Sequence, residues 1–187
     1  MDELIYLIVA AFVIFYAYKI YDDNVGLSIT GASFDSNEYK VQSKEDKKEA
    51  ANILAKIRKN LNTLYSHLIV NFPQEQTTQN LKNNYNSFSN IMENNNSAST
   101  SYTLNKEKIV MCLRNKDDEF VKMNELMFVA IHEMTHIGTK SIQHTVEFWN
   151  NFKFILKEAE KLKLWYYVDY GDFPQDYCGI QINSLPN

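Results

Sequence analysis

The chain has 187 residues, of which 45% are apolar and 13% aromatic, so wholesale disorder is excluded and one domain with appendages is expected. Its formal net charge of −4 excludes the strongly basic balance of a typical nucleic-acid-binding protein. Two cysteines, Cys112 and Cys178, are too few for a disulfide framework and slightly favour a reducing compartment. A single bridge between them stays open as an alternative.

The first predicted element is an apolar helix at the amino terminus. Residues 4–18 form an unbroken run of 15 apolar or aromatic residues. As a helix this run covers about 22 Å, and extension to Tyr21 gives about 27 Å, against roughly 30 Å of hydrocarbon core. The acidic start does not fit a cleaved signal peptide, and a buried core helix would normally keep a polar stripe. We therefore predict a transmembrane anchor over residues 1–23, with the domain on the cytoplasmic side because Lys19 follows the acidic start.

A long amphipathic helix is predicted after a juxtamembrane linker. The linker spans residues 24–43 and is expected to include extended structure near residues 38–41. Ser43 and Asp46 form a capping-box pattern, and the helix is expected to end before Pro73. His67 lies at the edge of the apolar stripe and is expected to be a partly exposed helix residue. The stripe itself comprises Ala50, Ile53, Leu54, Ile57, Leu61, Leu64 and Leu68.

Short strands and two further helices are predicted in the second half of the chain. A short helix around residues 80–92 precedes a loop, and residues 100–104 and 109–113 have the pattern of a β-hairpin. Residues 124–137 are almost wholly apolar, which is typical of a buried helix that ends at Gly138. Another helix is predicted from Thr145 to Leu164, followed by an irregular aromatic tail. The expected fold class is α+β and mostly helical.

The sequence His132-Glu133-Met134-Thr135-His136 is the strongest chemical signal in the chain. Residues four apart share one face of a helix, so both imidazoles can reach one metal ion. Glu133 lies about 100° further round, where its carboxylate can accept the proton of an attacking water. The alternative is a pair of hydrogen-bonded core histidines. We predict a zinc site with Glu133 as the catalytic base.

A catalytic zinc site needs a third protein ligand and one open position. His144 follows His136 by eight residues, beyond the glycine turn, and a chain reversal there would return it to the metal. The rival ligands are Glu147, Glu158 and Asp169, and we favour His144. Candidates for stabilising an oxyanion are numerous, and none can be chosen from the sequence. They are Tyr166, Tyr167, Tyr170, Tyr177 and, more remotely, His67.

This motif, followed by the block His144-Thr145-Val146-Glu147-Phe148-Trp149, resembles the WLM and SprT-like zinc metallopeptidases. Residues 109–114 resemble the strand that precedes the active helix in that family. Residues 49–54 and the tail 168–179 are similar to short, N-terminally anchored members from large DNA viruses. The resemblance covers roughly residues 35–182. It implies a zincin-like metallopeptidase domain over residues 44–187, with zinc bound by His132, His136 and His144.

The expected function is a membrane-anchored zinc metallopeptidase that hydrolyses protein substrates. The alternative is a structural or assembly protein of the virion that keeps the fold without essential catalysis. The intact Glu133 favours the enzyme, because a structural zinc site has no need of a base. The expected partners are a membrane through residues 4–21, a protein substrate, and capsid or other virion proteins. Some WLM relatives cut proteins crosslinked to DNA, but nucleic acid is not expected as a partner here, because the chain lacks a basic surface in bulk.

Overall fold

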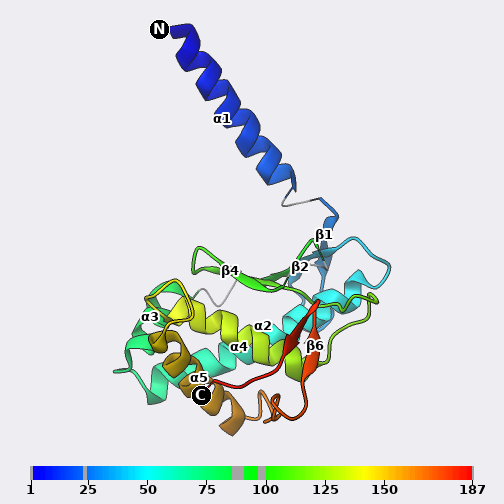
Figure 1. The fold of residues 1–187 in the computed structure, drawn as a ribbon. Coiled ribbons are helices and arrows are strands. Elements are labelled where there is room, and N and C mark those ends of the chain that lie inside the picture. The colour runs from blue at the N-terminus through cyan, green and yellow to red at the C-terminus, as the bar shows by residue number, and fades with distance from the viewer. Residues whose placement is uncertain (1, 23–24, 86–90, 97–99, 187) are drawn as a thin grey trace.

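The computed structural model describes residues 2–22, 25–85, 91–96 and 100–186. A helical body forms one layer and small β-sheets lie beside it, which is the predicted α+β, mostly helical class (Figure 1). The helices are α1 (Asp2–Asp22), α2 (Lys47–Asn71), α3 (Gln76–Asn84), α4 (Met123–Gly138) and α5 (Val146–Lys161). The strands are β1 (Leu27–Gly31), β2 (Glu38–Gln42), β3 (Ile91–Glu93), β4 (Tyr102–Leu104), β5 (Lys108–Met111), β6 (Gln175–Tyr177) and β7 (Ile180–Ile182).

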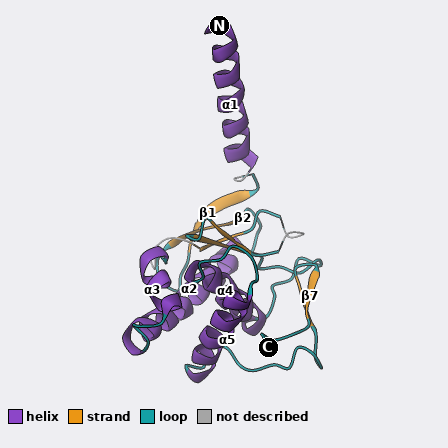
Figure 2. Cartoon of the chain, turned by 60° about the vertical axis from the view of Figure 1, so that its left-hand side comes forward, coloured by secondary structure: helices purple, strands orange, loops and turns teal. Residues whose placement is uncertain are grey.

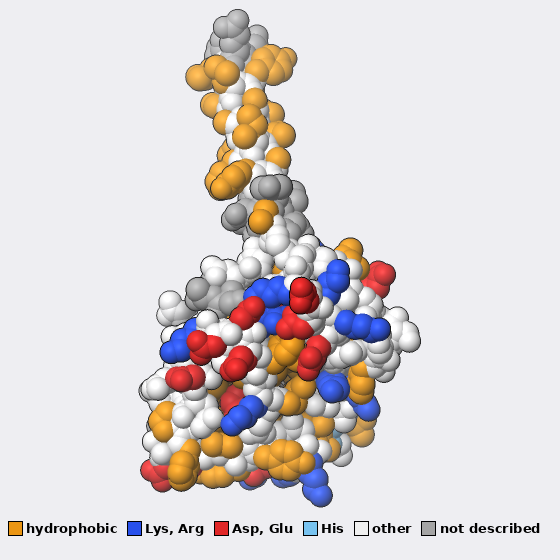
Figure 3. All heavy atoms as spheres, turned by 90° about the vertical axis from the view of Figure 1, so that its right-hand side faces the viewer, with side chains coloured by type: hydrophobic (Ala, Val, Ile, Leu, Met, Phe, Trp, Pro, Cys, Tyr) orange, Lys and Arg blue, Asp and Glu red, His pale blue; other side chains and the backbone are white. Residues whose placement is uncertain are grey.

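Helix α1 stands apart from the body, and its side chains from Leu4 to Tyr18 are exposed (Figures 1 and 3). Within the described residues, no helix combines the length and the apolar character that a membrane crossing requires. The predicted transmembrane helix and the single-pass membrane localisation are therefore wrong. The physical reason is length, because the uninterrupted apolar run over residues 4–18 extends only about 22 Å against a core of roughly 30 Å.

Helix α2 confirms the predicted amphipathic helix, since every position of its apolar stripe is buried. Its beginning differs from the prediction, because Asp46 is the N-cap residue but makes no side-chain cap hydrogen bond. The Asp46 carboxylate instead accepts two hydrogen bonds from the Arg114 guanidinium, at 2.6 and 2.7 Å. Arg114 is almost fully buried and also donates to Glu93 at 3.0 Å. A tertiary ion pair has thus replaced the local cap.

The predicted extended structure near residues 38–41 is present as β2, which pairs with β1 in an antiparallel hairpin. Tyr39 and Val41 point from β2 into the core that α2 also lines. Figure 2 shows this hairpin between α1 and the group formed by α2, α4 and α5. The hairpin is joined to the next sheet because the Gln42 backbone N–H donates to the Glu93 carboxylate at 2.8 Å. Residues 38–42 are therefore part of the folded body.

A three-stranded sheet in the order β3-β5-β4 lies against α4. The predicted hairpin is confirmed by the antiparallel pairing of β4 with β5. Residues 105–107 connect them, and Asn105 and Lys106 have φ values of 53° and 56°, as the two central residues of a primed turn require. The short helix predicted around residues 80–92 lies earlier, as α3, while residues 86–90 are outside the described residues and 91–93 form β3. Strand β3 pairs with β5 in parallel.

The tail that was expected to be irregular contains an antiparallel hairpin of β6 and β7. Tyr177 and Ile182 from this hairpin are buried in the main core. A disulfide between Cys112 and Cys178 fastens the hairpin to the end of β5, with Cα atoms 6.3 Å apart. The bridge that the sequence left open is therefore formed. It holds β6 and β7 beside the carboxyl-terminal end of the β4–β5 hairpin.

Candidate active site

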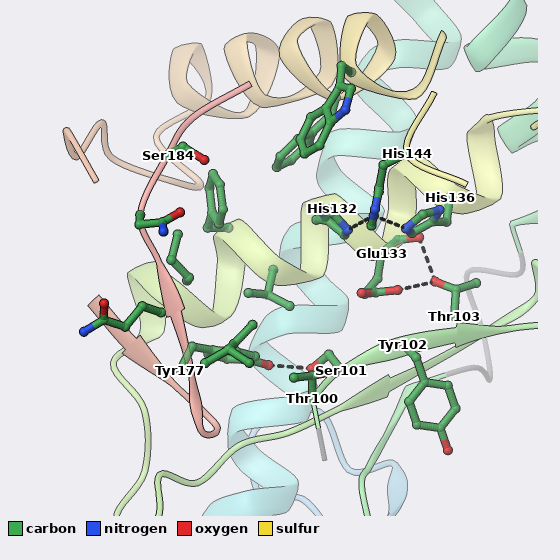
Figure 4. A pocket seen from close by; sticks show the side chains of 18 of the residues that line it. Thr100, Ser101, Tyr102, Thr103, His132, Glu133, His136, His144, Tyr177 and Ser184 are labelled. Atoms are coloured by element: carbon green, nitrogen blue, oxygen red, sulfur yellow. Dashed lines mark hydrogen bonds between the residues drawn. The ribbon is translucent and has the colours of Figure 1, made fainter. Parts of the chain in front are cut away.

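Three histidine side chains converge at the carboxyl-terminal half of α4. His132 and His136 come from α4 itself, which is buried along most of its length, and His144 comes from the segment just before α5. The Nε2 atom of His144 lies 2.9 Å from that of His132 and 3.1 Å from that of His136 (Figure 4). Among the described residues, these three form the cluster of potential metal-binding side chains.

The arrangement fits a tetrahedral metal ion. Three imidazole nitrogens bound to one zinc at 2.0–2.1 Å lie about 3.3 Å from one another. The observed separations of 2.9 and 3.1 Å are close to this value. An ion held by the three rings would accept all three Nε2 lone pairs at once, which hydrogen bonds among neutral imidazoles cannot do. Three nitrogen ligands would leave a fourth position for solvent or substrate, as in catalytic rather than structural zinc sites.

Phe148 supports all three rings from behind. Its ring centroid lies 4.8 Å from His132, 4.4 Å from His136 and 4.7 Å from His144. Phe148 is fully buried in the first turn of α5, and its backbone N–H bonds to the hydroxyl of the N-cap residue Thr145. A rigid aromatic neighbour restricts the rotamers of the rings that pack on it. Phe148 thereby holds the three imidazoles in a converging orientation.

The histidines are kept in the neutral form that binds metals. Burial lowers the pKa of His132 to about 3 and that of His136 to about 4, and mutual repulsion between the rings adds to the effect. Burial also lowers the pKa of His144. Neutral imidazole is the ligand form, so protons do not compete for these nitrogens near neutral pH.

Glu133 is buried beside this cluster and faces the sheet. The Thr103 hydroxyl of β4 lies 2.8 Å from the Glu133 carboxylate and 2.9 Å from its backbone carbonyl (Figure 4). Burial raises the pKa of the Glu133 carboxyl from 4.5 to about 7, although the Thr103 hydrogen bond opposes the rise. A carboxyl with a pKa near neutrality can both accept and return a proton. Thr103 fixes the direction in which the carboxylate points.

The raised pKa of Glu133 predicts that Glu133→Gln stabilises the metal-free protein at pH 8. Between pH 4.5 and 7 the folded state retains the Glu133 proton and the unfolded state loses it, so stability falls as pH rises. Above pH 7 the full penalty, on the order of 3 kcal/mol, is present. We expect urea unfolding in EDTA to show a gain of about 2–3 kcal/mol at pH 8 and little gain at pH 4.5. The exposed Glu160→Gln serves as control, and an equal gain at both pH values would contradict the prediction.

The segment that carries His144 is fastened by Lys106. The Lys106 ammonium reaches across from the β4–β5 turn and donates to the backbone carbonyls of Thr139, Lys140 and Ser141, at 2.5, 2.7 and 3.2 Å. On the other side, the Glu147 carboxylate accepts the backbone N–H groups of Lys140 and Ser141, each at 3.3 Å. The chain between α4 and α5 is thus held from two directions before it reaches His144.

The end of α4 is shaped by a close approach of α3. A Cβ atom at Gly138 would lie 2.6 Å from the Thr77 hydroxyl and 3.2 Å from the Thr77 carbonyl, so only glycine allows this contact. The Asn80 side chain then donates to the Gly138 carbonyl at 3.0 Å. The helix ends at Gly138, two residues after His136, and the chain can then turn back toward the histidine cluster.

Loss of the Lys106 clamp should weaken metal binding. In Lys106→Met the three carbonyls lose their shared donor, and the segment before His144 gains freedom that metal binding must remove. We expect zinc affinity, measured by competition with a chromophoric chelator, to fall about tenfold or more. Lys116→Met, an exposed change in the loop after β5, should leave the affinity unchanged. An unaltered affinity in Lys106→Met, with a normal melting temperature, would show that the segment needs no such clamp.

The histidines and Glu133 open onto a cavity of about 1010 Å³. One wall comes from α4 and the start of α5, another from residues 100–106, and a third from residues 180–184 after the disulfide. Tyr177, one of the candidates for oxyanion stabilisation, also lines the cavity. Its hydroxyl is engaged, since it donates to the Cys112 carbonyl at 2.8 Å and contacts the Ser101 hydroxyl at 2.5 Å (Figure 4).

The rival third ligands lie away from the histidine cluster. Glu147 holds backbone N–H groups as described, and the Asp169 carboxylate accepts the N–H groups of Gly171 and Asp172. Glu158 pairs with His67 at 3.0 Å and with Lys161 at 2.5 Å. His67 does not line the cavity, and neither do Tyr166, Tyr167 and Tyr170.

The sequence did not indicate how three residues act on the site. Thr103 was expected only as a strand residue and Lys106 only as part of a turn. Phe148 belonged to the block that carries the family resemblance and to an apolar helix face, but no contact with the histidines was predicted for it. Each acts on the site through a contact between residues far apart in the chain: 30 residues for Thr103–Glu133, 35 for Lys106–Ser141 and 16 for Phe148–His132. The hairpin pattern in the sequence locates the turn in which Lys106 has its positive φ. It gives no indication of the backbone carbonyls that Lys106 binds.

One family model and three viral proteins match the chain. A model described as the WLM domain matches residues 75–174, more than half of the chain. An uncharacterized protein of Acanthamoeba polyphaga mimivirus is 31% identical over 163 residues, which cover 84% of this chain and 83% of that protein. Uncharacterized proteins of Invertebrate iridescent virus 6 and Invertebrate iridescent virus 3 are each 35% identical over 81 residues. These matches cover 42% and 43% of this chain, and 44% and 50% of those proteins. No solved structure matches significantly.

Proposed function

Because the chain belongs to the WLM domain family, which is metallopeptidase-like, we propose that it is a zinc-dependent peptidase acting on polypeptides. In this proposal His132, His136 and His144 hold the metal and Glu133 is the general base. The observation that carries it is the convergence of three Nε2 atoms beside a buried carboxylate at the edge of an open cavity. The histidines line the open cavity, so a polypeptide that enters the cavity can reach them.

The residues of the site would divide the work of peptide hydrolysis. A bound zinc ion would supply Lewis-acid chemistry, polarising the scissile carbonyl and acidifying the attacking water. Glu133 would take the proton from that water and then return it to the leaving amine, a double role for which a pKa of about 7 is suited. Thr103 would keep the carboxylate aimed at the water through its 2.8 Å hydrogen bond. Phe148 and Lys106 would keep the imidazoles in place.

A structural or assembly role in the virion is the competing function. The relatives from large DNA viruses make a virion location plausible, but their names state no activity. Burial of the charged Glu133 carboxylate costs free energy and destabilises the fold. The raised pKa of this group reflects that cost. A purely structural metal site has no use for such a group and commonly has four protein ligands. The retained Glu133 therefore supports catalysis.

The test uses the full chain, purified without metal and then supplied with zinc. We expect one equivalent of bound zinc by atomic spectrometry and time-dependent cleavage of casein that EDTA abolishes and added zinc restores. One equivalent of zinc with no cleavage of casein, or of a mixture of denatured proteins, would favour the structural role. A folded protein that binds no zinc would overturn the proposal. Cleavage that rises on addition of DNA would favour a nucleic-acid-associated protease.

A further inference from the structure

The cavity of the candidate site has a second end that the proposed chemistry does not use. Phe128 and Val129 line the cavity together with His132 and Glu133, so they share one face of α4. Phe128 precedes His132 by one helical turn, which places it about 6 Å along the helix axis from the first metal ligand. The cavity therefore runs from a polar end at the histidines to an apolar end at the preceding turn.

Aromatic and aliphatic side chains from three elements enclose the apolar end. Phe152 of α5 and Ile182 of β7 are almost fully buried, and Trp149 and Ile180 form a partly exposed rim. Phe128 packs on Phe152 with ring centroids 5.2 Å apart and on Tyr170 at 4.9 Å. Rings packed in this way are held before any ligand arrives. The apolar end is a preformed recess with a buried floor and an accessible mouth.

Charge is confined to the other end of the cavity. Among the described lining residues other than the histidines, Glu133 and Lys106 are the ones with charged groups. Glu133 lies beside the metal-binding cluster, and the Lys106 ammonium is bound by three backbone carbonyls. A charged side chain placed against Phe128, Phe152 and Ile182 would lose its water without gaining a partner of opposite charge, although Gln181, Asn183 and Ser184 also line the cavity. The recess therefore selects against charged groups.

We propose that this recess is a specificity subsite that takes a large apolar or aromatic side chain of the polypeptide substrate. The rise of about 6 Å along α4 between Phe128 and His132 is less than two residues of an extended chain, so the side chain belongs to a residue close to the bond that is cut. This inference rests on the proposed peptidase function and deepens it. It assigns the substrate class as polypeptide segments with exposed apolar residues, which unfolded chains present.

Small hydroxamates test the subsite without turnover, because they bind a zinc ion and can carry different side groups. The probes are acetohydroxamic acid, 3-phenylpropanohydroxamic acid and succinic acid monohydroxamate, titrated into the zinc-loaded full chain by calorimetry. We expect the phenyl probe to bind about tenfold or more tightly than the acetyl probe, as burial of a phenyl group predicts. The carboxylate probe should gain nothing over the acetyl probe.

Two variants locate the preference in the recess. Val129→Asp places a carboxylate in the recess, and Ile180→Asp places one at its exposed rim, where folding is least affected. In both variants, the Kd of acetohydroxamic acid divided by the Kd of 3-phenylpropanohydroxamic acid should fall from about ten or more toward one. Val70→Asp is the matched control, because Val70 is an exposed apolar residue of α2 outside the cavity. Its ratio should equal that of the unaltered chain.

A metal-free titration separates this proposal from the peptidase function. In EDTA, N-acetylphenylalanine amide should shift the Val129 methyl signals in NMR spectra, and N-acetylaspartate amide should not. Methyl shifts in a protein that binds no zinc would overturn the peptidase function and leave the subsite in place. Equal affinities for the three hydroxamates with no methyl shift would overturn the subsite and leave the metal site in place. A phenyl preference that survives both aspartate variants would also overturn it.

Discussion

We expect the replacement of Glu133 with Gln to lower the rate of peptide hydrolysis about a thousandfold or more and to leave one equivalent of zinc bound. General base catalysis typically contributes about a hundredfold to ten-thousandfold to a rate. Gln has nearly the same shape and can still accept the 2.8 Å hydrogen bond from Thr103, but it cannot take a proton. The metal ligands are untouched, so the effect falls on the chemical step. The measurement is kcat/KM on a peptide found in the casein digest, with zinc determined in the same samples.

Glu160→Gln provides the matched control for this result. Glu160 is exposed on α5 and lies outside the cavity, so its kcat/KM should match that of the unaltered chain. A residual rate in Glu133→Gln above about a tenth of the normal rate would assign the base to another group. Loss of zinc in Glu133→Gln would instead mean that the carboxylate supports the metal directly.

We expect the replacement of His136 with Ala to remove zinc binding, with an affinity loss of more than about a hundredfold. Loss of a residue that only orients a ligand costs about tenfold to a hundredfold, and loss of a ligand itself costs more. The ligand atoms that the three histidines offer lie within 4.8 Å of one another, so all three can contribute to a single ion. Burial already keeps the pKa of His136 near 4, so neutral histidine is available to the metal at pH 7 without loss of a proton. Affinity is measured by competition with a chromophoric chelator.

His144→Ala and His67→Ala complete this experiment. His144 is the exposed member of the cluster and arrives from outside α4, so its replacement tests the third ligand separately. His67 is the fourth histidine of the chain and pairs with Glu158, so His67→Ala should retain the normal zinc affinity. An unchanged affinity in His144→Ala would remove His144 from the ligand set and reduce the site to the two histidines of α4.

Periodicity in the sequence was sufficient for the main helices and for one pair of site residues. The apolar stripe from Ala50 to Leu68 predicted α2, and the apolar segment before Gly138 predicted α4. Such patterns indicate a buried helix whichever elements cover it. His132 and His136 share a face of α4 for the same reason, since four residues complete about one turn. Local chemistry was misleading where a tertiary partner intervened, as at Asp46, which binds Arg114 instead of capping its helix.

The predicted transmembrane anchor over residues 1–23 was wrong because it relied on a local apolar pattern alone. An apolar run of 15 residues is easily seen in the sequence, yet the described helices include none with the length and apolarity for a membrane crossing. The tail was also expected to be irregular, because neither of its three-residue strands is long enough to show an alternating pattern. Their pairing depends on a turn and on the Cys112–Cys178 disulfide.

By itself the sequence determined the histidine pair of α4, the neighbouring Glu133 and the helical frame, because these depend on spacing along one element. Only the tertiary structure decided that His144 meets that pair, that Thr103 and Lys106 hold Glu133 and the segment before His144, and that an apolar recess adjoins the site. Each of these contacts joins elements separated in the chain, and their closeness results from packing of α4 against β4 and α5. Side-chain packing between elements has no period in the sequence, so spacing alone could not predict it.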